Sequence, residues 1–333
     1  MRAMHTANST TPRAWWAAAL AAAVLLSLIS GFNQVKAMGL SWQEEHYTAR
    51  LEAVAAGEAG SPWQYRVLSD GLTLAAIHAA EAAGVQRAAG VTMVAIRIAQ
   101  NIALFLLLFG YLSAAGVSAY AALLGMMALA WIMTLTNYNS DLAVNTYTEI
   151  VLYLAAGWCV LLRWSWPILP MTVIAALNRE TSGLIPLMLL ASAYGWTDPR
   201  ERVAGLRIGA AALAAYGVVF CGLRLWFGSR GWEVHPSGAV QGWALLRYNL
   251  TFDRSWGHLA GTFSLLPLLA VFGWRGAPSA LKAFTLVVLP VWIPVHLLFS
   301  AVAETRLFLV PLVVVVLPLA MLAVQRMPEA ETA

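Results

Sequence analysis

Long apolar stretches recur along this chain, and short polar segments separate them. A membrane-crossing helix needs about 20 mostly apolar residues, because each backbone polar group must find its partner within its own segment. Of the 333 residues, 60% are hydrophobic and only 11% are charged, and the mean hydropathy is +0.70. Soluble domains usually carry about 25% charged residues. We therefore expect an all-α, polytopic helical membrane protein that forms a single transmembrane domain over residues 1–333.

The apolar stretches predict about ten transmembrane helices. They lie at residues 14–32, 91–112, 117–135, 146–162, 164–177, 182–194, 206–227, 258–274, 281–302 and 306–324. The fifth and sixth stretches hold about 14 and about 13 residues, whereas a crossing helix usually needs at least about 17. These two stretches could instead form one long tilted helix with a polar middle.

The basic residues predict an orientation for the chain. If both short stretches cross, one set of basic residues falls on the side of the amino terminus: Arg2, Arg13, Arg163, Arg200, Arg202, Arg207, Arg275, Lys282 and Arg326. Short loops rich in Lys and Arg face the cytoplasm. The amino terminus is therefore predicted to be cytoplasmic. The first apolar stretch is longer than the apolar core of a signal peptide, and we expect it to be an uncleaved anchor.

A polar turn interrupts the apolar sequence at Asn178-Arg179-Glu180-Thr181. An ionisable side chain inside hydrocarbon costs about 2.5–3.5 kcal/mol even on lenient insertion scales, so such residues point to functional sites. We expect the turn to lie at the outer face of the membrane, where Arg179 and Glu180 can contact a charged ligand. In the alternative interpretation, these two residues pair with each other and only lower the cost of a polar turn.

Two long segments are predicted on the outer side, at residues 33–90 and 228–257. The first holds two weakly amphipathic helical patterns, separated by the breaker cluster Gly57-Glu58-Ala59-Gly60-Ser61-Pro62. Both helices are predicted to lie at the membrane surface. Ser41, with Glu44 three residues later, has the spacing of a capping box at the start of the first of these helices.

Several short motifs resemble those of a known family. Glu44-Glu45-His46-Tyr47, with Ala49 and Gly57, looks like the start of the first outer loop in the GT-C superfamily, where the leading acid is usually aspartate. Residues 175–181 are similar to the turn between the fifth and sixth helices of such enzymes. Two further motifs look like outer-face motifs of related bacterial proteins: Ser61-Pro62-Trp63-Gln64-Tyr65-Arg66-Val67-Leu68 and Glu304-Thr305-Arg306. The GT-C superfamily comprises integral membrane glycosyltransferases that use polyprenyl-phosphate sugar donors.

The resemblance implies a GT-C-like fold with two juxtamembrane helices in the first outer loop. It also implies a location in the bacterial inner (plasma) membrane, with the site facing the periplasm or the outside. The expected partners are a lipid-linked sugar donor and membrane lipids, and no basic run suggests nucleic acid. No cofactor is indicated with certainty. Whether a divalent metal ion binds stays open, because Glu44, Glu45, His46 and Asp141 are suitable ligands but their spacing is not diagnostic.

An inverting transfer from a lipid phosphate needs a base for the acceptor hydroxyl and positive groups for the departing phosphate. The predicted catalytic carboxylates are Glu44, Glu45 and Asp141. Arginine suits the phosphate because its planar fork donates two hydrogen bonds and stays charged. The predicted substrate-binding residues are Arg66, Arg97, Asn178, Arg179, Glu180, Glu304 and Arg306.

These residues also have structural interpretations. Glu44 and Glu45 could form the solvated start of a surface helix. Arg66 and Arg306 could extend to lipid headgroups, and Arg97 could join two helices. The function has two alternatives as well: a transporter or flippase of a lipid-linked saccharide, and a non-catalytic membrane subunit.

Overall fold

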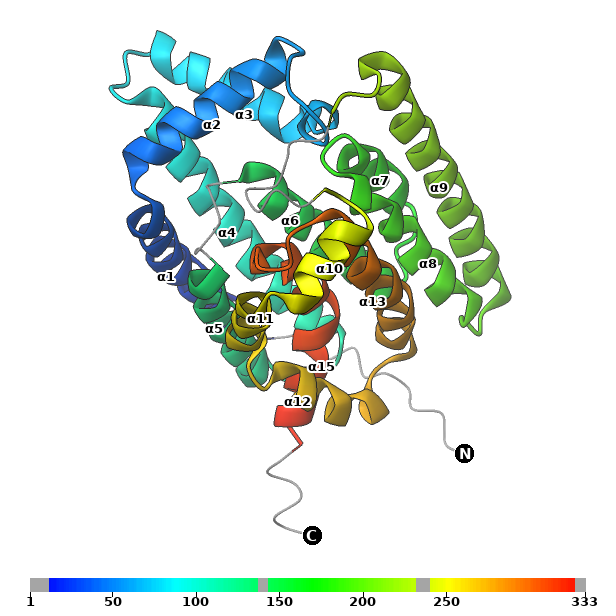
Figure 1. Cartoon of the computed structure of the whole chain (residues 1–333). Coiled ribbons are helices and arrows are strands. Elements are labelled where there is room, and N and C mark those ends of the chain that lie inside the picture. Colours follow the sequence, from blue (N-terminus) through cyan, green and yellow to red (C-terminus); the bar gives the residue numbers. More distant parts are fainter. Residues whose placement is uncertain (1–11, 137–142, 232–239, 327–333) are drawn as a thin grey trace.

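The computed structural model describes residues 12–136, 143–231 and 240–326, and these residues form helices with no strand among them (Figure 1). The all-α prediction is therefore confirmed for the described part of the chain. The α-helices are α1 (Arg13–Met38), α2 (Leu40–Ala55), α3 (Val67–Ala82), α4 (Ala88–Ala114), α5 (Ala119–Leu135), α6 (Val144–Leu161), α7 (Ile168–Ala176), α8 (Leu184–Tyr194), α9 (Pro199–Phe227), α10 (Trp243–Thr251), α11 (Asp253–Phe263), α12 (Leu266–Gly273), α13 (Ser279–Phe299), α14 (Leu309–Pro311) and α15 (Leu317–Val324).

Short helical turns complete the fold. They are the 3₁₀ helices η1 (Trp63–Tyr65), η3 (Glu180–Gly183), η4 (Trp274–Gly276) and η5 (Thr305–Phe308), and the π-helical segment η6 (Leu312–Val316). A π-helical turn inside an apolar helix widens it locally. The turns η3 and η5 hold the polar residues on which the functional site depends.

Six helical segments of the described chain are long and apolar enough to cross a membrane. They are Arg13–Ala37, Ala88–Ala114, Val144–Leu161, Pro199–Phe227, Ser279–Phe299 and Thr305–Val324. The pair Asp253–Phe263 and Leu266–Gly276 brings the number to seven if this pair, bent by 56°, is counted as one span. The predicted count of about ten is not confirmed. In the segment Thr305–Val324, 89% of an 18-residue stretch is buried, so the last apolar helix lies in the interior of the molecule.

The helices α7 and α8 are two separate short helices and not one long tilted helix. They have 9 and 11 residues, which correspond to about 14 Å and 17 Å of helix, whereas the hydrocarbon core is about 30 Å thick. Arg163, just before α7, contacts Glu201 near the start of α9 at 2.5 Å. The segment before α7 therefore lies beside the segment after α8, and the two helices form a hairpin with the polar turn at its tip.

Two glycines allow this hairpin to pack closely against α9. A Cβ atom at Gly209 would lie 2.7 Å from the Leu190 side chain of α8, and one at Gly205 would lie 2.8 Å from the Cβ atom of Ala193. Such distances are shorter than van der Waals contact, so only glycine fits without rearrangement. The close packing holds α9 against the carboxyl-terminal half of α8.

Within residues 33–90, which were predicted as an outer loop, the helices α2, η1 and α3 lie across the upper end of the molecule in Figure 1. Tyr47 and Leu51 of α2 are buried, and the backbone N–H of Val144 donates a hydrogen bond to the Tyr47 hydroxyl at 3.0 Å. The Ser41–Glu44 capping box predicted for this segment is wrong. The residue at the N-cap is Gly39, and α2 has no side-chain cap. We refer below to this end of the molecule as the α2–α3 end.

Candidate functional site

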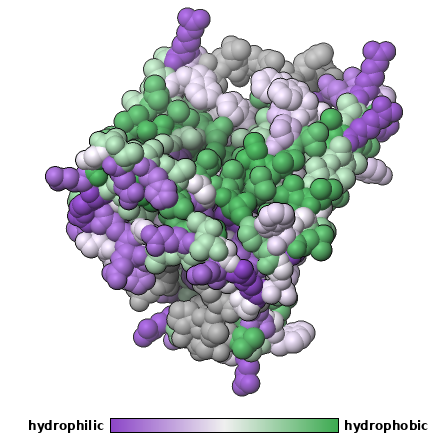
Figure 2. All heavy atoms as spheres, turned by 90° about the horizontal axis from the view of Figure 1, so that it is seen from above, coloured by the Kyte–Doolittle hydropathy of each residue, from purple (hydrophilic) through white to green (hydrophobic). Residues whose placement is uncertain are grey.

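A cavity of about 640 Å³ opens among η1, α8, α9, α10, α13 and η5. Its volume is in the range of small-molecule sites in proteins, roughly 300–1,000 Å³. The residues that line it are Pro62, Trp63, Arg66, Thr146, Arg179, Glu180, Thr181, Gly183, Leu184, Tyr216, Phe220, Arg224, Gln241, Leu245, Val291, Trp292, Val295, His296, Phe299, Ser300, Ala301, Glu304, Arg306 and Leu307. Figure 2, which looks onto the α2–α3 end, shows hydrophilic side chains beside a broad hydrophobic area.

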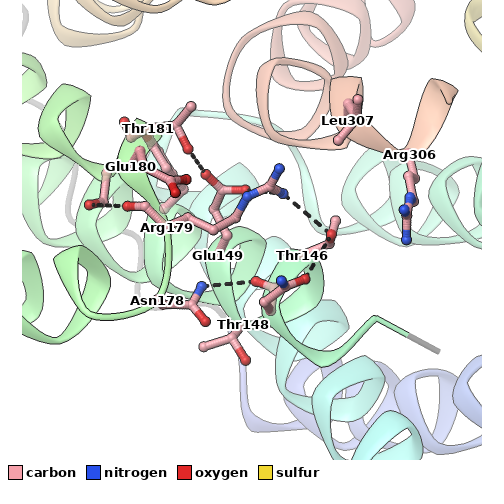
Figure 3. A network of polar contacts seen from close by, with 12 residues as sticks. Thr146, Thr148, Glu149, Asn178, Arg179, Glu180, Thr181, Arg306 and Leu307 are labelled. Carbon is pink, nitrogen blue, oxygen red and sulfur yellow. Dashed lines mark hydrogen bonds and ion pairs between the residues drawn. The ribbon is translucent and has the colours of Figure 1, made fainter. Parts of the chain in front are cut away.

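Arg179 extends from the hairpin tip toward α6 (Figure 3). Its guanidinium forms an ion pair with Glu149 at 2.8 Å, and both side chains are almost fully buried, with exposures of 6% and 2%. The guanidinium also donates to the Thr146 hydroxyl at 3.3 Å, and the Thr181 hydroxyl donates to the Glu149 carboxylate. A buried charge needs such partners. These contacts hold the Arg179 guanidinium in one position at the edge of the cavity.

The backbone of the hairpin tip is fixed from two sides. The Tyr153 hydroxyl of α6 donates to the Thr181 carbonyl at 2.5 Å, and the Tyr216 hydroxyl of α9 donates to the Glu180 carbonyl at 2.5 Å. Asn178 is fully buried; its amide donates to the Asn145 carbonyl at 2.9 Å, and its side-chain oxygen accepts from Ser69. Asn178 does not line the cavity, so the structure places this predicted binding residue behind the site.

Arg66 joins the first outer segment to the hairpin tip. Its guanidinium contacts the Glu180 carboxylate at 3.3 Å and lies 4.7 Å from the centre of the Trp63 ring. Burial lowers the pKa of Arg66 from its ordinary value, and the nearby Glu180 carboxylate opposes this shift. Arginine side chains keep their proton in proteins, so we expect Arg66 to carry its positive charge.

The residues just before Arg66 attach this segment to the end of α9. Gln64 and Tyr65 both donate hydrogen bonds to the Gly228 carbonyl, at 3.1 Å and 2.8 Å. The last carbonyls of a helix have no partner within the helix, and these two side chains supply one. Within the motif at residues 61–68, Gln64 and Tyr65 therefore anchor the segment to α9. Trp63 and Arg66 of the same motif line the cavity.

Glu304 and Arg306 reach the same cavity from the segment after α13. Their side chains contact each other at 3.1 Å, and both line the cavity. Asn249 of α10 fixes this segment, because its amide donates to the Ser300 carbonyl at 2.8 Å and its side-chain oxygen accepts from the backbone N–H of Val302 at 3.0 Å. The three motifs around Arg66, Arg179 and Arg306 are far apart in sequence and meet at one cavity.

The ion pairs differ from the alternative suggested by the sequence, in which Arg179 and Glu180 pair with each other. Arg179 pairs with Glu149, and Glu180 pairs with Arg66. Glu149 was not among the predicted site residues, because it lies in an apolar stretch about 30 residues before Arg179. Only the packing of α6 beside the hairpin tip brings it to Arg179.

The structure separates Glu44, Glu45 and Arg97 from the cavity lining. Glu44 contacts Arg87 at 2.5 Å and accepts from the backbone N–H of Gly90 at 3.1 Å. It therefore caps the start of α4, and this contact raises the pKa of Arg87 from its ordinary value. Glu45 is exposed. The Arg97 guanidinium donates to the Ala143 carbonyl at 3.1 Å and lies 3.4 Å from the centre of the Tyr147 ring.

Asp141 lies outside the described residues. No group of three or more His, Cys, Asp or Glu side chains that could hold a metal ion occurs in the part of the chain that the structure describes. The cavity therefore offers no assembled metal site among those residues, and its charged groups are arginines and carboxylates.

Several residues of the cavity lining were not predicted from the sequence. Tyr216, Phe220 and Arg224 lie at four-residue spacing along α9 and form one stripe on the cavity wall. Val291, Val295 and Phe299 form a second, apolar stripe along α13. The regular spacing of these residues is visible in the sequence and could have indicated a cavity wall. The same spacing also occurs in ordinary packing between membrane helices, so it becomes informative only when the positions of α9 and α13 are known.

The lining combines an apolar wall from α13, with Leu184 of α8, and charged groups from η1, the hairpin tip and the segment after α13. Such an arrangement suits an amphiphile whose apolar part contacts α13 and whose anionic group contacts the arginines. Comparisons of the chain with protein-family models, with curated proteins and with solved structures found no match.

Proposed function

We propose that this chain is an integral membrane glycosyltransferase of the GT-C type that binds a polyprenyl-phosphate-linked sugar in the cavity described above. One observation carries the proposal: Arg66, Arg179 and Arg306 come from three distant segments and line one cavity whose other wall is apolar. A lipid phosphate combines the two chemical features that this cavity matches. Its charged oxygens suit the guanidinium forks, and its chain suits the apolar wall.

The proposed topology has ten transmembrane segments. The short helix α5, the bent pair α11–α12 and the two arms of the α7–α8 hairpin would add to the six long helical segments. Gln325 contacts the Gly116 carbonyl at 3.2 Å, and Arg326 contacts the Gly276 carbonyl at 3.1 Å, so the α4–α5 and α12–α13 connections lie beside the residues that follow α15. Arg275 and Arg326 of the predicted basic set lie at this end. The positive-inside rule supports its placement in the cytoplasm, with the cavity on the opposite side of a bacterial inner membrane.

The proposed reaction is an inverting displacement. A carboxylate takes the proton of the acceptor hydroxyl, the acceptor oxygen forms a bond to the anomeric carbon, and the bond from this carbon to the lipid phosphate breaks. The phosphate leaves with the electron pair, and the arginines stabilise its charge. In the proposed reaction, the arginines supply the positive charge that stabilises the leaving phosphate.

Glu304 is the base that the geometry favours. Of the two carboxylates that line the cavity, Glu304 has the more exposed side chain, 29% against 23% for Glu180. One Glu180 oxygen accepts from Arg66, and the other is buried without a hydrogen-bond partner among the described residues. Glu44 serves as a helix cap, so we assign the base to Glu304 in place of Glu44 or Glu45.

The test uses purified protein in lipid nanodiscs and a panel of polyprenyl-phosphate sugars. Release of polyprenyl phosphate and glycosylation of the acceptor are followed by mass spectrometry. Removal of a general base typically lowers the rate about 10²–10⁴-fold, so Glu304→Gln should lose activity to this extent. The matched control is Glu81→Gln, which changes an exposed carboxylate of α3 and should keep normal turnover. Absence of any transfer with the whole panel, or full activity of Glu304→Gln, would contradict this assignment.

A transporter of lipid-linked saccharides is the second candidate. The observation that favours it is the pairing of both lining carboxylates with arginines, Glu180 with Arg66 and Glu304 with Arg306. An adjacent cation stabilises the charged form of a carboxylate and weakens it as a base. Proteoliposomes with a fluorescent lipid-linked sugar would distinguish the two functions, because a transporter moves the lipid between leaflets without releasing polyprenyl phosphate.

A further inference from the structure

Arg224 is a fourth arginine of the cavity, and no sequence motif drew attention to it. It lies near the carboxyl end of α9, above Phe220 and Tyr216 on the stripe that lines the cavity. Its guanidinium carbon lies 3.4 Å from the centre of the Phe220 ring and 4.6 Å from the centre of the Tyr65 ring. Two aromatic rings therefore hold the charge at the edge of the cavity.

Arg224 differs in its contacts from the other three arginines of the cavity. Arg66, Arg179 and Arg306 each contact a carboxylate, that of Glu180, Glu149 and Glu304 respectively. Within the described ranges, no carboxylate lies within ion-pair distance of Arg224. Its partners are the two rings and the Phe220 carbonyl, which accepts at 3.3 Å. Among the described residues, Arg224 is therefore the one cavity arginine without a carboxylate partner, and it adds positive charge to the cavity.

The geometry leaves Arg224 able to bind a ligand. A guanidinium has five N–H donors, and the Phe220 carbonyl occupies one of them. None of the Arg224 nitrogens is among the buried side-chain atoms that lack a partner, so the remaining donors are not enclosed by the protein. An arginine at a membrane-helix end usually extends to the headgroup region, whereas this one lies over rings at the cavity edge.

We infer that Arg224 is a specificity-determining residue that contacts the anionic group of the lipid ligand and selects anionic over neutral amphiphiles. This inference rests on the proposed function, because it concerns the same cavity. A purely structural role would be to attach η1 to α9. That attachment already has two hydrogen bonds, from Gln64 and Tyr65 to the Gly228 carbonyl.

The experiment measures binding of decaprenyl phosphate and of decaprenol, the neutral alcohol of the same chain length, to the full-length protein in nanodiscs. The readout is the ratio of the two dissociation constants. We expect wild type to prefer the phosphate. Arg224→Gln should reduce this preference about 10-fold to 100-fold by weakening phosphate binding alone, since a hydrogen bond to a charged group contributes about 1.5–3 kcal/mol. Arg224→Lys should keep part of the preference, because it keeps the charge without the fork.

Two control variants separate ligand contact from folding. Arg254→Gln removes an exposed arginine of α11 outside the lining and should keep the wild-type ratio. Tyr65→Phe removes the hydrogen bond to the Gly228 carbonyl but keeps the ring beside Arg224. It should also keep the ratio, whereas a structural role of this contact would make it behave like Arg224→Gln.

The outcomes distinguish the inference from the function on which it rests. If wild type binds the alcohol as well as the phosphate, the proposed anionic lipid ligand is wrong. If wild type prefers the phosphate and Arg224→Gln has the same preference, Arg224 does not select the ligand, while the proposed function stands. If Arg224→Gln is poorly folded, two other measurements test whether Arg224 selects the ligand: the binding ratio of Arg224→Lys, and the salt dependence of phosphate binding to wild type. An unchanged ratio in Arg224→Lys together with salt-independent binding overturns the inference.

Discussion

At the scale of single residues, the central feature is the buried ion pair between Arg179 and Glu149. A buried pair is not by itself a strong source of stability, because both charges lose hydration. Loss of one partner is costly, however, since it leaves an uncompensated charge. The Arg179–Glu149 pair, with the Thr146 and Thr181 hydroxyls, therefore fixes a guanidinium at the cavity edge.

We expect Arg179→Ala to lower the free energy of unfolding by about 3–5 kcal/mol, because Glu149 stays buried without its partner. Glu149→Gln should also destabilise the protein, since Arg179 loses its carboxylate. The double variant Arg179→Ala/Glu149→Gln should lose less than the sum of the two single losses. The measurement is unfolding in detergent for all four proteins of this double-mutant cycle. Additive losses would show that the pair does not act as a unit.

Some site residues could be predicted from the sequence, and others could not. Arg66, Arg179 and Arg306 could be found because each lies in a polar interruption near an apolar stretch. Arg224 could not, because an arginine near the end of an apolar helix looks like an ordinary headgroup contact. The capping box of Glu44 within its own helix was wrong, because local spacing suggested it while the partner of Glu44, Arg87, lies 43 residues away.

At the scale of elements, the α7–α8 hairpin positions the site. Its α8 arm packs on α9 through Gly205 and Gly209, and its tip is held by Tyr153 and Tyr216. The short lengths of both arms follow from Pro167 before α7 and the polar turn before α8. The sequence predicted the two segments and their polar connection, but composition alone could not exclude one tilted helix.

Cysteine labelling tests the hairpin. In a background with Cys159→Ser and Cys221→Ser, which removes both native cysteines, we expect Thr181→Cys and Thr197→Cys to react with an impermeant reagent from opposite sides of the membrane. The reason is that Thr181 lines the cavity at the hairpin tip, whereas Thr197 lies at the hairpin's open end. A third variant, Ala49→Cys on the exposed face of α2, should label from the same side as Thr181. Labelling of Thr181 and Thr197 from one side would contradict the proposed topology.

At the scale of the whole molecule, charged segments from three parts of the chain meet at one apolar cavity. The fold achieves this by placing η1, the hairpin tip and η5 at the α2–α3 end, around α9 and α13. The fold class followed from hydropathy, because a chain this apolar has few alternatives to membrane helices. The convergence of the three motifs could not be derived from hydropathy, since apolar patterns do not specify which helices are neighbours.

Photo-crosslinking tests most directly whether a polyprenyl phosphate occupies this cavity. A decaprenyl phosphate analogue with a diazirine in its chain is activated on the protein in nanodiscs, and labelled peptides are mapped by mass spectrometry. We predict labels at α9 and α13 positions of the cavity wall, such as Phe220, Val295 and Phe299. Excess decaprenyl phosphate should suppress these labels, and excess decaprenol should not. Labels confined to outward-facing residues such as Leu225 and Trp226, or equal suppression by both competitors, would contradict an anionic lipid site in this cavity.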